Sequence, residues 1–350
     1  MTSAAPGNIV PPFISGERAA TVTPESTAAR AAQRAAVHEV YARAAEEPDT
    51  SLCCVDGGAW TLPDLVVPPR MLEMNYGCGS TVHPTDLTGS RPILYVGVGG
   101  GLEALQFAYF RRQPGGVIAV DPVAEMRAAA AANLAEAERL NPWFRRDFVR
   151  LVDGRAEQLP VDDASVEVVA QNCLFNVFVE EDLARALREV ARVLRPGGRF
   201  STSDPITPRP LPQALKDDPT LRARCVSGCV TYDEYLAAHH AAGLQQLVVR
   251  ARRPYRLLTP ADFACLDGEL MLESLELLAI KGLRVDAEPD IYAGRCATFV
   301  GSGIWYRDDK FPFPAGTPMQ VSDRVAAELA RRPDFRVTPP TFHARGPGCC

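Results

Sequence analysis

The stretch ILYVGVGGG, residues 93–101, joins a short apolar run to a helical pattern that continues through residues 102–112. Four consecutive apolar residues followed by glycines predict a buried strand that enters a tight turn, because glycine permits backbone angles that other residues avoid. The first backbone N–H groups of the following helix stay available to a ligand. The stretch therefore predicts a strand–turn–helix unit that can hold a nucleotide-like group.

The same alternation of strand and helix continues along the chain. The later apolar runs that predict strands are 117–120, 148–152, 166–170 and 199–203, and the helical patterns between them cover 123–140 and 182–194. Short apolar strands separated by helices of this kind are typical of a parallel, doubly wound α/β sheet. We predict that fold class.

Length and composition set the expected domain organisation. The chain has 350 residues, of which 47% are hydrophobic, as in ordinary globular proteins. This length suits roughly two domains, or one domain with an appended lobe. We expect an N-terminal tail and helix over residues 1–60, the α/β domain over 61–255, and a smaller C-terminal lobe over 256–350.

The charge balance excludes several classes of partner. Lys and Arg number 37 against 43 Asp and Glu, which gives a net charge of −6 and a mildly acidic surface. Such a surface without long basic runs argues against a nucleic-acid groove or a polybasic membrane anchor. The first 18 residues lack the basic and apolar segments of a secretory signal. We expect a cytoplasmic protein with neither nucleic acid nor membrane as a partner.

The glycine spacing in the turn separates two classes of cofactor. Dinucleotide-binding enzymes favour G-x-G-x-x-G, whereas Gly97, Gly99 and Gly101 form G-x-G-x-G. Asp121 closes the second predicted strand about 20 residues later, where an acid can accept hydrogen bonds from both hydroxyls of a ribose. A nucleoside-containing cofactor is therefore predicted at this turn.

The ten cysteines suggest chemistry with soft ions or redox chemistry rather than structural bridges. Cys-x-x-Cys and zinc-finger spacings are both missing from the sequence, so a structural zinc site is not predicted. Cys173 follows the fourth predicted strand, at the sheet edge where ligands bind, and Cys78 lies on a glycine-flanked loop before the first strand. Cys225 and Cys229 share one face if their segment is helical.

The glycine turn belongs to a wider set of motifs. Together with LRPGGR at residues 194–199 and GRAEQLP at 154–160, it resembles the class I methyltransferases that use S-adenosylmethionine. One departure is Tyr95, two residues before Gly97, where that family usually carries an acid that anchors the methionine end of the cofactor. The resemblance implies S-adenosylmethionine as cofactor, bound by Gly97, Gly99, Gly101, Asp121, Pro122, Met126, Ala156, Glu157 and Asn172.

The cysteine motifs make the resemblance more specific. YGCG at 76–79, Asn172-Cys173 and CVSG at 225–228 resemble the three cysteine motifs of arsenite S-adenosylmethionine methyltransferases. The resemblance implies that Cys78, Cys173 and Cys225 are arsenic(III) ligands and that Cys54 joins them as a catalytic residue. Cys53-Cys54 matches a further N-terminal cysteine of that family, whereas Cys229 departs from it and receives no role.

The chain ending also has a counterpart in the family. Cys349-Cys350 resembles the Cys-Cys ending of a bacterial branch associated with organoarsenical, arsenosugar-type biosynthesis. The resemblance implies arsenite or methylarsenite as substrate and a thiol reductant of the glutathione or thioredoxin type. The terminal pair is expected to assist turnover, by relaying electrons or by capturing arsenic, without being required for the first methylation.

The chemistry of trivalent arsenic agrees with these motifs. Arsenic(III) is soft and binds three thiolates in a pyramid with a lone pair left over, so a cysteine site selects it over hard ions. The lone pair can attack a sulfonium methyl group directly, and positioning supplies most of the catalysis. A general base is unnecessary, which fits a chain of only five histidines without an evident His/Asp dyad.

Two other interpretations remain open. A methyltransferase of a small organic substrate would keep the cofactor and tolerate loss of Cys78 and Cys225. A non-catalytic, thiol-based metalloid-binding protein would bind arsenic without transferring a methyl group. Cys265 and Cys296, isolated in apolar runs, are expected to fill the core, as free cysteines often do, and His83 and His343 are expected to be surface or packing residues.

Overall fold

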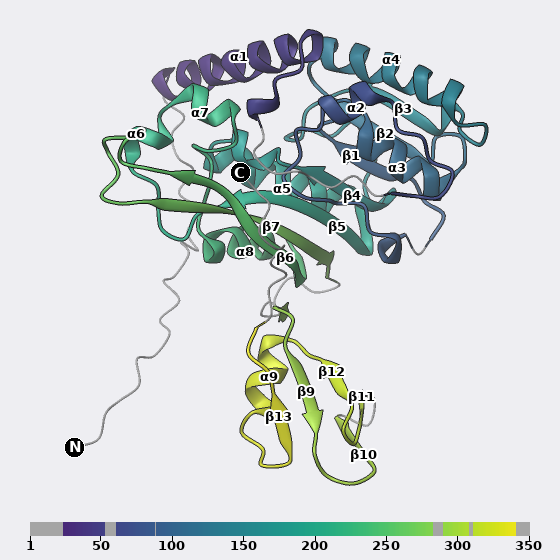
Figure 1. Cartoon of the computed structure of the whole chain (residues 1–350), viewed down its shortest axis with the longest axis vertical. Coiled ribbons are helices and arrows are strands. Elements are labelled where there is room, and N and C mark those ends of the chain that lie inside the picture. The colour runs from purple at the N-terminus through teal and green to yellow at the C-terminus, as the bar shows by residue number, and fades with distance from the viewer. Residues whose placement is uncertain (1–23, 53–60, 88, 283–289, 308–310, 341–350) are drawn as a thin grey trace.

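The computed structural model describes residues 24–52, 61–87, 89–282, 290–307 and 311–340, and Figure 1 shows their arrangement. One eight-stranded sheet runs through the main body, in the order β3-β2-β1-β4-β5-β7-β6-β8. Its strands are β1 (Ile93–Val96), β2 (Val117–Asp121), β3 (Val149–Asp153), β4 (Val166–Asn172), β5 (Leu194–Ile206), β6 (Leu244–Leu258), β7 (Leu270–Lys281) and β8 (Asp290–Tyr292).

The sheet is mixed rather than wholly parallel. Strands β1 to β5 pair in parallel, as predicted, but β7 is antiparallel to both β5 and β6. The predicted parallel pairing is therefore confirmed for the five strands that it covered, and β7 is an antiparallel addition that the sequence did not indicate. Strands β6 and β7 follow one another as a long hairpin, and β7 enters the sheet between β5 and β6.

Helices cover both faces of the sheet (Figure 1). On one face, Ile93 and Tyr95 of β1 pack in a core with α3 (Leu102–Arg111) and α4 (Ala124–Leu140). On the other face, Leu94 and Val96 pack in a core with α5 (Glu180–Val193) and α8 (Tyr232–Ala241). Alternate residues of β1 thus pack into two different cores, as expected for a strand buried on both faces.

Three further helices lie near the carboxyl edge of the sheet. They are α1 (Pro24–Glu46), α2 (Pro69–Glu73) and α7 (Pro219–Ala223), and a short α6 (Gln213–Lys216) precedes the last of them. Helix α1 packs on α4 and α7, so it spans this edge (Figure 1). The helix expected within residues 1–60 is confirmed as α1. None of the helices in the described part of the chain combines the length and apolar character that crossing a bilayer requires.

The domain boundary expected at residue 255 falls inside β6 and is wrong. Strands β6 and β7 belong to the main sheet, so the α/β domain continues at least to Lys281. The sequence of β6 does not show a regular strand pattern, because Arg252, Arg253 and Pro254 interrupt its apolar alternation. The pairing register also shifts next to Pro254. Proline removes a ladder hydrogen bond and is usually found at such irregularities.

A separate small unit follows the sheet. It contains α9 (Asp323–Leu329) and the strands β9 (Cys296–Phe299), β10 (Ile304–Arg307), β11 (Phe311–Pro314), β12 (Pro318–Gln320) and β13 (Phe335–Val337). Phe299, Phe313, Leu329 and Phe335 form its own buried cluster. A smaller C-terminal lobe therefore exists, but it begins later in the chain than the sequence indicated.

Candidate functional site

The carboxyl ends of β1, β2 and β4 border one cavity with about 1290 Å³ of space, part of it open to solvent. In open α/β sheets ligands bind at this edge, where the connecting loops diverge. The cavity is lined by the glycine turn, by the segments that follow β2, β3 and β4, by the loop before β1, and by α1. Its position matches the nucleoside site predicted from the sequence.

The glycine turn uses its glycines in two ways. Gly97, Gly99 and Gly101 have φ angles of +81°, +52° and +88°, which side-chain-bearing residues rarely adopt. Gly97 and Gly99 line the cavity, as predicted. Gly101 does not line it: Gly101 precedes α3, and a Cβ there would face Met71 and Ala130. The predicted contact of Gly101 with the cofactor is therefore not supported, and this glycine instead permits the turn and the close packing at the start of α3.

Asp121 lies at the end of β2 and lines the cavity. Its Oδ2 accepts a hydrogen bond from the Val98 backbone N–H at 3.0 Å, and its Oδ1 accepts one from the Val123 N–H at 2.9 Å. Burial raises the pKa of Asp121 to about 6, and the two backbone donors oppose that rise. Each carboxylate oxygen can accept a second hydrogen bond, as from a ribose diol.

The remaining predicted cofactor residues also line the cavity: Pro122, Met126, Ala156, Glu157 and Asn172. Two of them have side chains already engaged. Glu157 Oε1 accepts from Arg34 at 3.2 Å and from Arg155 at 3.3 Å. Asn172 accepts from the Cys78 N–H and donates to the Gly79 carbonyl, both at 2.9 Å. Asn172 thus holds the Cys78 loop against the cavity.

Helix α1 contributes residues that the sequence reasoning missed. Gln33, Arg34, Val37 and His38 line the cavity. Gln33 Nε2 donates to the Val177 carbonyl at 3.0 Å, and Arg34 pairs with Asp182 at 3.0 Å as well as with Glu157. These contacts fasten α1 across the cavity. The sequence predicted the helix, but its pattern of Ala and Arg carried no signal of what it covers.

Four thiols lie together in a single buried cluster next to this cavity. Cys78, Cys173, Cys225 and Cys229 belong to the same apolar core, and each is at most 4% exposed. Of the four, only Cys173 also lines the cavity. The fold therefore brings the three predicted arsenic ligands together from distant segments and adds Cys229, to which the sequence assigned no role.

Each thiol has a defined contact. Cys225 Sγ donates to the Cys173 carbonyl at 2.8 Å, and Cys229 Sγ donates to the Cys225 carbonyl at 3.2 Å. Asn176 Nδ2 donates to Cys229 Sγ at 3.2 Å. Burial, followed by the neighbouring Cys225, raises the pKa of the Cys229 thiol well above its ordinary value. A buried thiol of this kind keeps its proton at neutral pH.

Two of these cysteines have an unusual backbone. Cys173 and Cys225 have φ angles of +58° and +57°, in the left-handed region that favours glycine. Such conformations cost free energy and persist only where the surroundings enforce them, often at functional sites. The left-handed backbone therefore gives the side chains of both cysteines directions that the usual strand or helix conformation would not give them.

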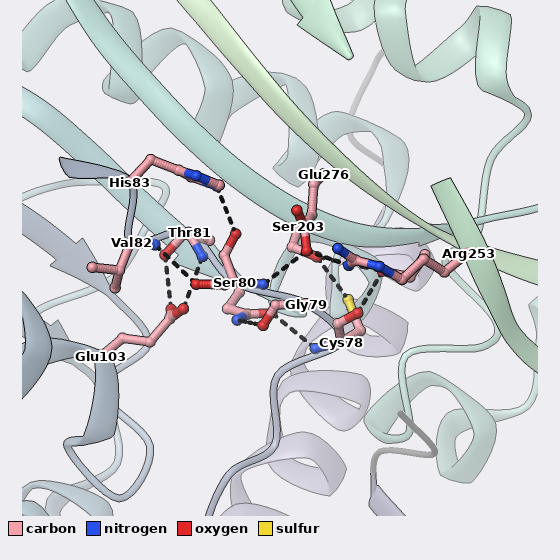
Figure 2. A network of polar contacts seen from close by, with 12 residues as sticks. Cys78, Gly79, Ser80, Thr81, Val82, His83, Glu103, Ser203, Arg253 and Glu276 are labelled. Carbon is pink, nitrogen blue, oxygen red and sulfur yellow. Dashed lines mark hydrogen bonds and ion pairs between the residues drawn. The ribbon is translucent and has the colours of Figure 1, made fainter. Parts of the chain in front are cut away.

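Cys78 is held by the polar network shown in Figure 2. Its Sγ lies 3.4 Å from Ser203 Oγ, and its carbonyl accepts from Ser274 Oγ. Glu276 of β7 accepts from the Ser80 N–H at 3.0 Å and also pairs with Arg253. The loop is therefore fixed to β5 and β7 on one side and, through Asn172, to β4 on the other.

The four thiols share one buried core but are not arranged as a ready-made chelate. Across the described ranges, no three His, Cys, Asp or Glu side chains form a group that could hold a metal ion. Binding of a three-coordinate ion would require the thiols to turn away from their present hydrogen-bond partners. Cys53, Cys54, Cys349 and Cys350 fall outside the described residues, so their predicted roles stay predictions.

Two cysteines expected to fill the core do not. Cys265 is exposed and Cys296 is half-buried on β9. Cys265 follows the end of β6 in a turn, where the neighbouring Phe263 and Leu266, rather than Cys265 itself, pack against the core. His83 is half-buried, with its ring 3.2 Å from the Ser80 carbonyl, as expected for a packing residue, and His343 is outside the described residues.

Comparison with known proteins agrees with these features. Residues 94–202 match a family described as a methyltransferase domain. An arsenite methyltransferase of Halobacterium salinarum is 32% identical over 177 residues, which cover 51% of this chain and 43% of that protein. One of Aquipseudomonas alcaligenes is 34% identical over 200 residues, covering 55% and 56%. The chain thus spans about half the length of these curated relatives.

A solved structure extends the comparison beyond that region. An arsenic(III) S-adenosylmethionine methyltransferase from Chlamydomonas reinhardtii superposes with a TM-score of 0.56 at 24% sequence identity, covering 79% of this chain and 94% of that one. The predicted fold class is confirmed: the chain has the class I methyltransferase fold with a mixed central sheet. The similarity to arsenite methyltransferases, inferred from the cysteine motifs, is confirmed as well.

Proposed function

We propose that the chain is an S-adenosylmethionine-dependent methyltransferase that acts on trivalent arsenic. The observation that carries the proposal is the position of Cys173, which lines the cofactor cavity and also belongs to the buried thiol cluster. One residue therefore connects a site suited to a nucleoside cofactor with a site suited to a soft, thiophilic ion. An arsenic atom bound beside Cys173 would face the cavity.

The cavity suits the cofactor. Asp121 retains acceptor capacity for a ribose diol, and the glycine turn leaves space beside the backbone at Gly99, where a Cβ would meet only one atom, at 3.8 Å. Met126 and Ala156 offer buried apolar surface to an adenine ring. When bound, S-adenosylmethionine supplies an electrophilic methyl group on a sulfonium sulfur.

The buried thiols suit arsenite because they can bind it without a base. Arsenite at neutral pH is the uncharged As(OH)₃, and each As–S bond that replaces an As–OH bond releases one water, formed from the hydroxide and the thiol proton. Thiols that are still protonated are therefore no obstacle to binding. Cys78, Cys173 and Cys225 would form the three As–S bonds and leave the arsenic lone pair directed to the cavity.

Methylation consumes this lone pair in the new As–C bond, so arsenic is formally oxidised from the trivalent to the pentavalent state. Two thiolates that leave as a disulfide return two electrons to arsenic, and a water that loses a proton, or a small thiol, completes the coordination of the methylarsenic(III) product. A thiol reductant, of the glutathione or thioredoxin class, then reduces the disulfide. The same reaction cycle would serve either arsenic detoxification or organoarsenical biosynthesis.

The direct experiment is mass spectrometry of the arsenic species formed when the purified full chain is incubated with arsenite, S-adenosylmethionine and a thiol. The proposal expects monomethylated arsenic to appear with equimolar S-adenosylhomocysteine. Cofactor consumption that requires an added quinone or other small organic substrate, without methylated arsenic, would instead favour the organic-substrate methyltransferase. Arsenic binding without any methylated product would favour the non-catalytic metalloid-binding protein.

The predicted role of Asp121 can be tested through pH. Because burial raises its pKa to about 6, the carboxylate that accepts ribose hydroxyls is fully formed only above that pH. Cofactor affinity, measured by titration calorimetry, is expected to fall between pH 7 and pH 5. Asp121→Ala should weaken binding at pH 7.5 by about 1–3 kcal/mol, through loss of charge-assisted hydrogen bonds, and Asp121→Asn should remove the pH dependence.

Protonation of Asp121 has opposite effects on cofactor binding and on fold stability, so weaker binding at low pH can be distinguished from unfolding. A carboxyl group whose pKa is higher in the folded than in the unfolded chain opposes folding above pH 6, and this opposition disappears as the pH falls. Titration of Asp121 therefore stabilises the fold at pH 5 and cannot itself explain weaker binding there. An unchanged affinity in Asp121→Ala would remove this residue from the cofactor site.

A further inference from the structure

Glu103 is a buried acid at the second position of α3, and it lines the cofactor cavity. It is 6% exposed. Its carboxylate accepts from the Thr81 N–H at 2.8 Å and from the Thr81 hydroxyl at 2.7 Å (Figure 2). Tyr95 and Asn172 also act on it and oppose the rise in its pKa that burial causes. Every one of these partners is neutral.

Glu103 has no cationic counterpart among the described residues, where none of the ion pairs involves it. Burial raises its pKa, which shows that the hydrogen bonds do not fully compensate the lost solvation. Buried carboxylates are normally paired with a cation. A ligand that carries a positive charge into the cavity would supply that missing partner.

Tyr95 completes the arrangement from the end of β1. Its side chain is 6% exposed and lines the same cavity, and its ring packs 6.0 Å from that of Phe107. The pKa of Tyr95 is raised well above its ordinary value by burial and by Glu103, so its hydroxyl keeps its proton and can donate it toward the carboxylate. A hydroxyl that donates in this way keeps lone pairs that can accept a hydrogen bond from a ligand.

We propose that Tyr95 and Glu103 together bind the α-ammonium group of the methionine part of S-adenosylmethionine. Glu103 supplies the negative charge, and Tyr95, which lines the same cavity, supplies an acceptor oxygen. The inference rests on the proposed function, because it assigns a subsite within the proposed cofactor site. It explains why a buried acid without a described cation lines a cavity that is otherwise largely apolar.

The location agrees with the rest of the site. Asp121, at the end of β2, marks the ribose part of the cavity, whereas Asn172 and Cys173 lie at the end of β4. Strand β1 lies between β2 and β4, and both Glu103 and Asn172 line the cavity. The ammonium subsite therefore lies toward the thiols, on the side where the methionine part must extend from the ribose for its methyl group to face Cys173.

The test compares two ligands that differ in the proposed group. S-adenosylhomocysteine carries the amino-acid part, and 5′-methylthioadenosine lacks it, and both are titrated calorimetrically into the full chain. Glu103→Gln is expected to weaken S-adenosylhomocysteine binding by about 10- to 100-fold, as for loss of a hydrogen bond to a charged group, and 5′-methylthioadenosine binding by less than about 3-fold. Tyr95→Phe should show the same selectivity with a smaller loss.

Glu125→Gln is the matched control, because Glu125 is an exposed acid in the first turn of α4 and does not line the cavity. It should leave both affinities unchanged. The ratio of the two affinities is measured on one protein preparation, so partial unfolding of a variant cannot mimic the selective loss. Equal losses for both ligands, or no loss for either, would overturn the ammonium subsite. Failure of the unmodified chain to bind either ligand would instead contradict the proposed function.

Discussion

Serine in place of Cys173 or Cys225 is expected to lower the rate of arsenite methylation by about 100-fold or more, as misplacement of a reacting atom by about 1 Å can do. Serine is similar in size but is a hard oxygen donor, so the exchange removes an arsenic–sulfur bond with little change of shape. The serine hydroxyl can still donate to the Cys173 carbonyl, as the Cys225 thiol does at 2.8 Å. Melting temperature and cofactor affinity should therefore change little.

The measurement is single-turnover methylation with product analysis, performed beside Cys265→Ser as the matched control. Cys265 is exposed and its side chain is not part of the core that contains the four buried thiols, so its exchange should have no effect. Because three thiols act as one unit, a Cys173→Ser/Cys225→Ser double variant should be little slower than either single variant. Near-normal rates in both single variants would make the organic-substrate methyltransferase the better interpretation.

Alanine in place of Gly228 is expected to damage the thiol cluster through backbone sterics alone. Gly228 lies between Cys225 and Cys229, and a Cβ there would overlap the backbone of Asn176, at 2.6 Å from its carbonyl carbon and even closer to the oxygen. Backbone atoms cannot yield as a flexible side chain does, so the 225–229 segment must shift. Overpacking of this kind costs about 1–3 kcal/mol of stability, and displacement of Cys225 should slow methylation by about 10- to 100-fold.

Gly268→Ala is the corresponding control, because a Cβ at Gly268 would have no neighbour within 4 Å. Melting temperature, methylation rate and S-adenosylhomocysteine affinity are measured for both variants. We expect Gly228→Ala to lower the melting temperature and the methylation rate. Its affinity for S-adenosylhomocysteine should stay near that of the unmodified chain, since the glycine turn and Asp121 are on other segments. Normal methylation by Gly228→Ala would show that the position of this segment is unimportant.

The central features of the fold and site could be predicted because they depend on local patterns. The apolar run before Gly97 can only be a buried strand, and the positive φ angles at Gly97 and Gly99 follow from the tight turn that the glycines permit. The cysteine motifs could be connected because strand ends and their loops meet at one sheet edge. Their burial in one cluster follows from the same topology.

Other features depend on tertiary packing and have no local signature. The coverage of the cavity by α1 depends on contacts such as that of Arg34 with Asp182, which lies 148 residues away in the sequence. The same holds for Glu103, whose burial and hydrogen bonds to Thr81 appear only in the folded chain. The insertion of β7 between β5 and β6 was missed because a strand's neighbours are decided by the whole sheet rather than by its own residues.

Binding of arsenic by the three thiols can be tested by arsenic K-edge X-ray absorption spectroscopy of the full chain loaded with one equivalent of arsenite. We expect an arsenic(III) centre with three sulfur ligands, one of which is replaced by a lighter atom in Cys225→Ser. Addition of S-adenosylmethionine should then introduce an As–C contribution in the unmodified chain. A spectrum with only oxygen ligands, or three sulfur ligands that persist unchanged in the Cys78→Ser, Cys173→Ser and Cys225→Ser variants, would contradict arsenic binding by these three thiols.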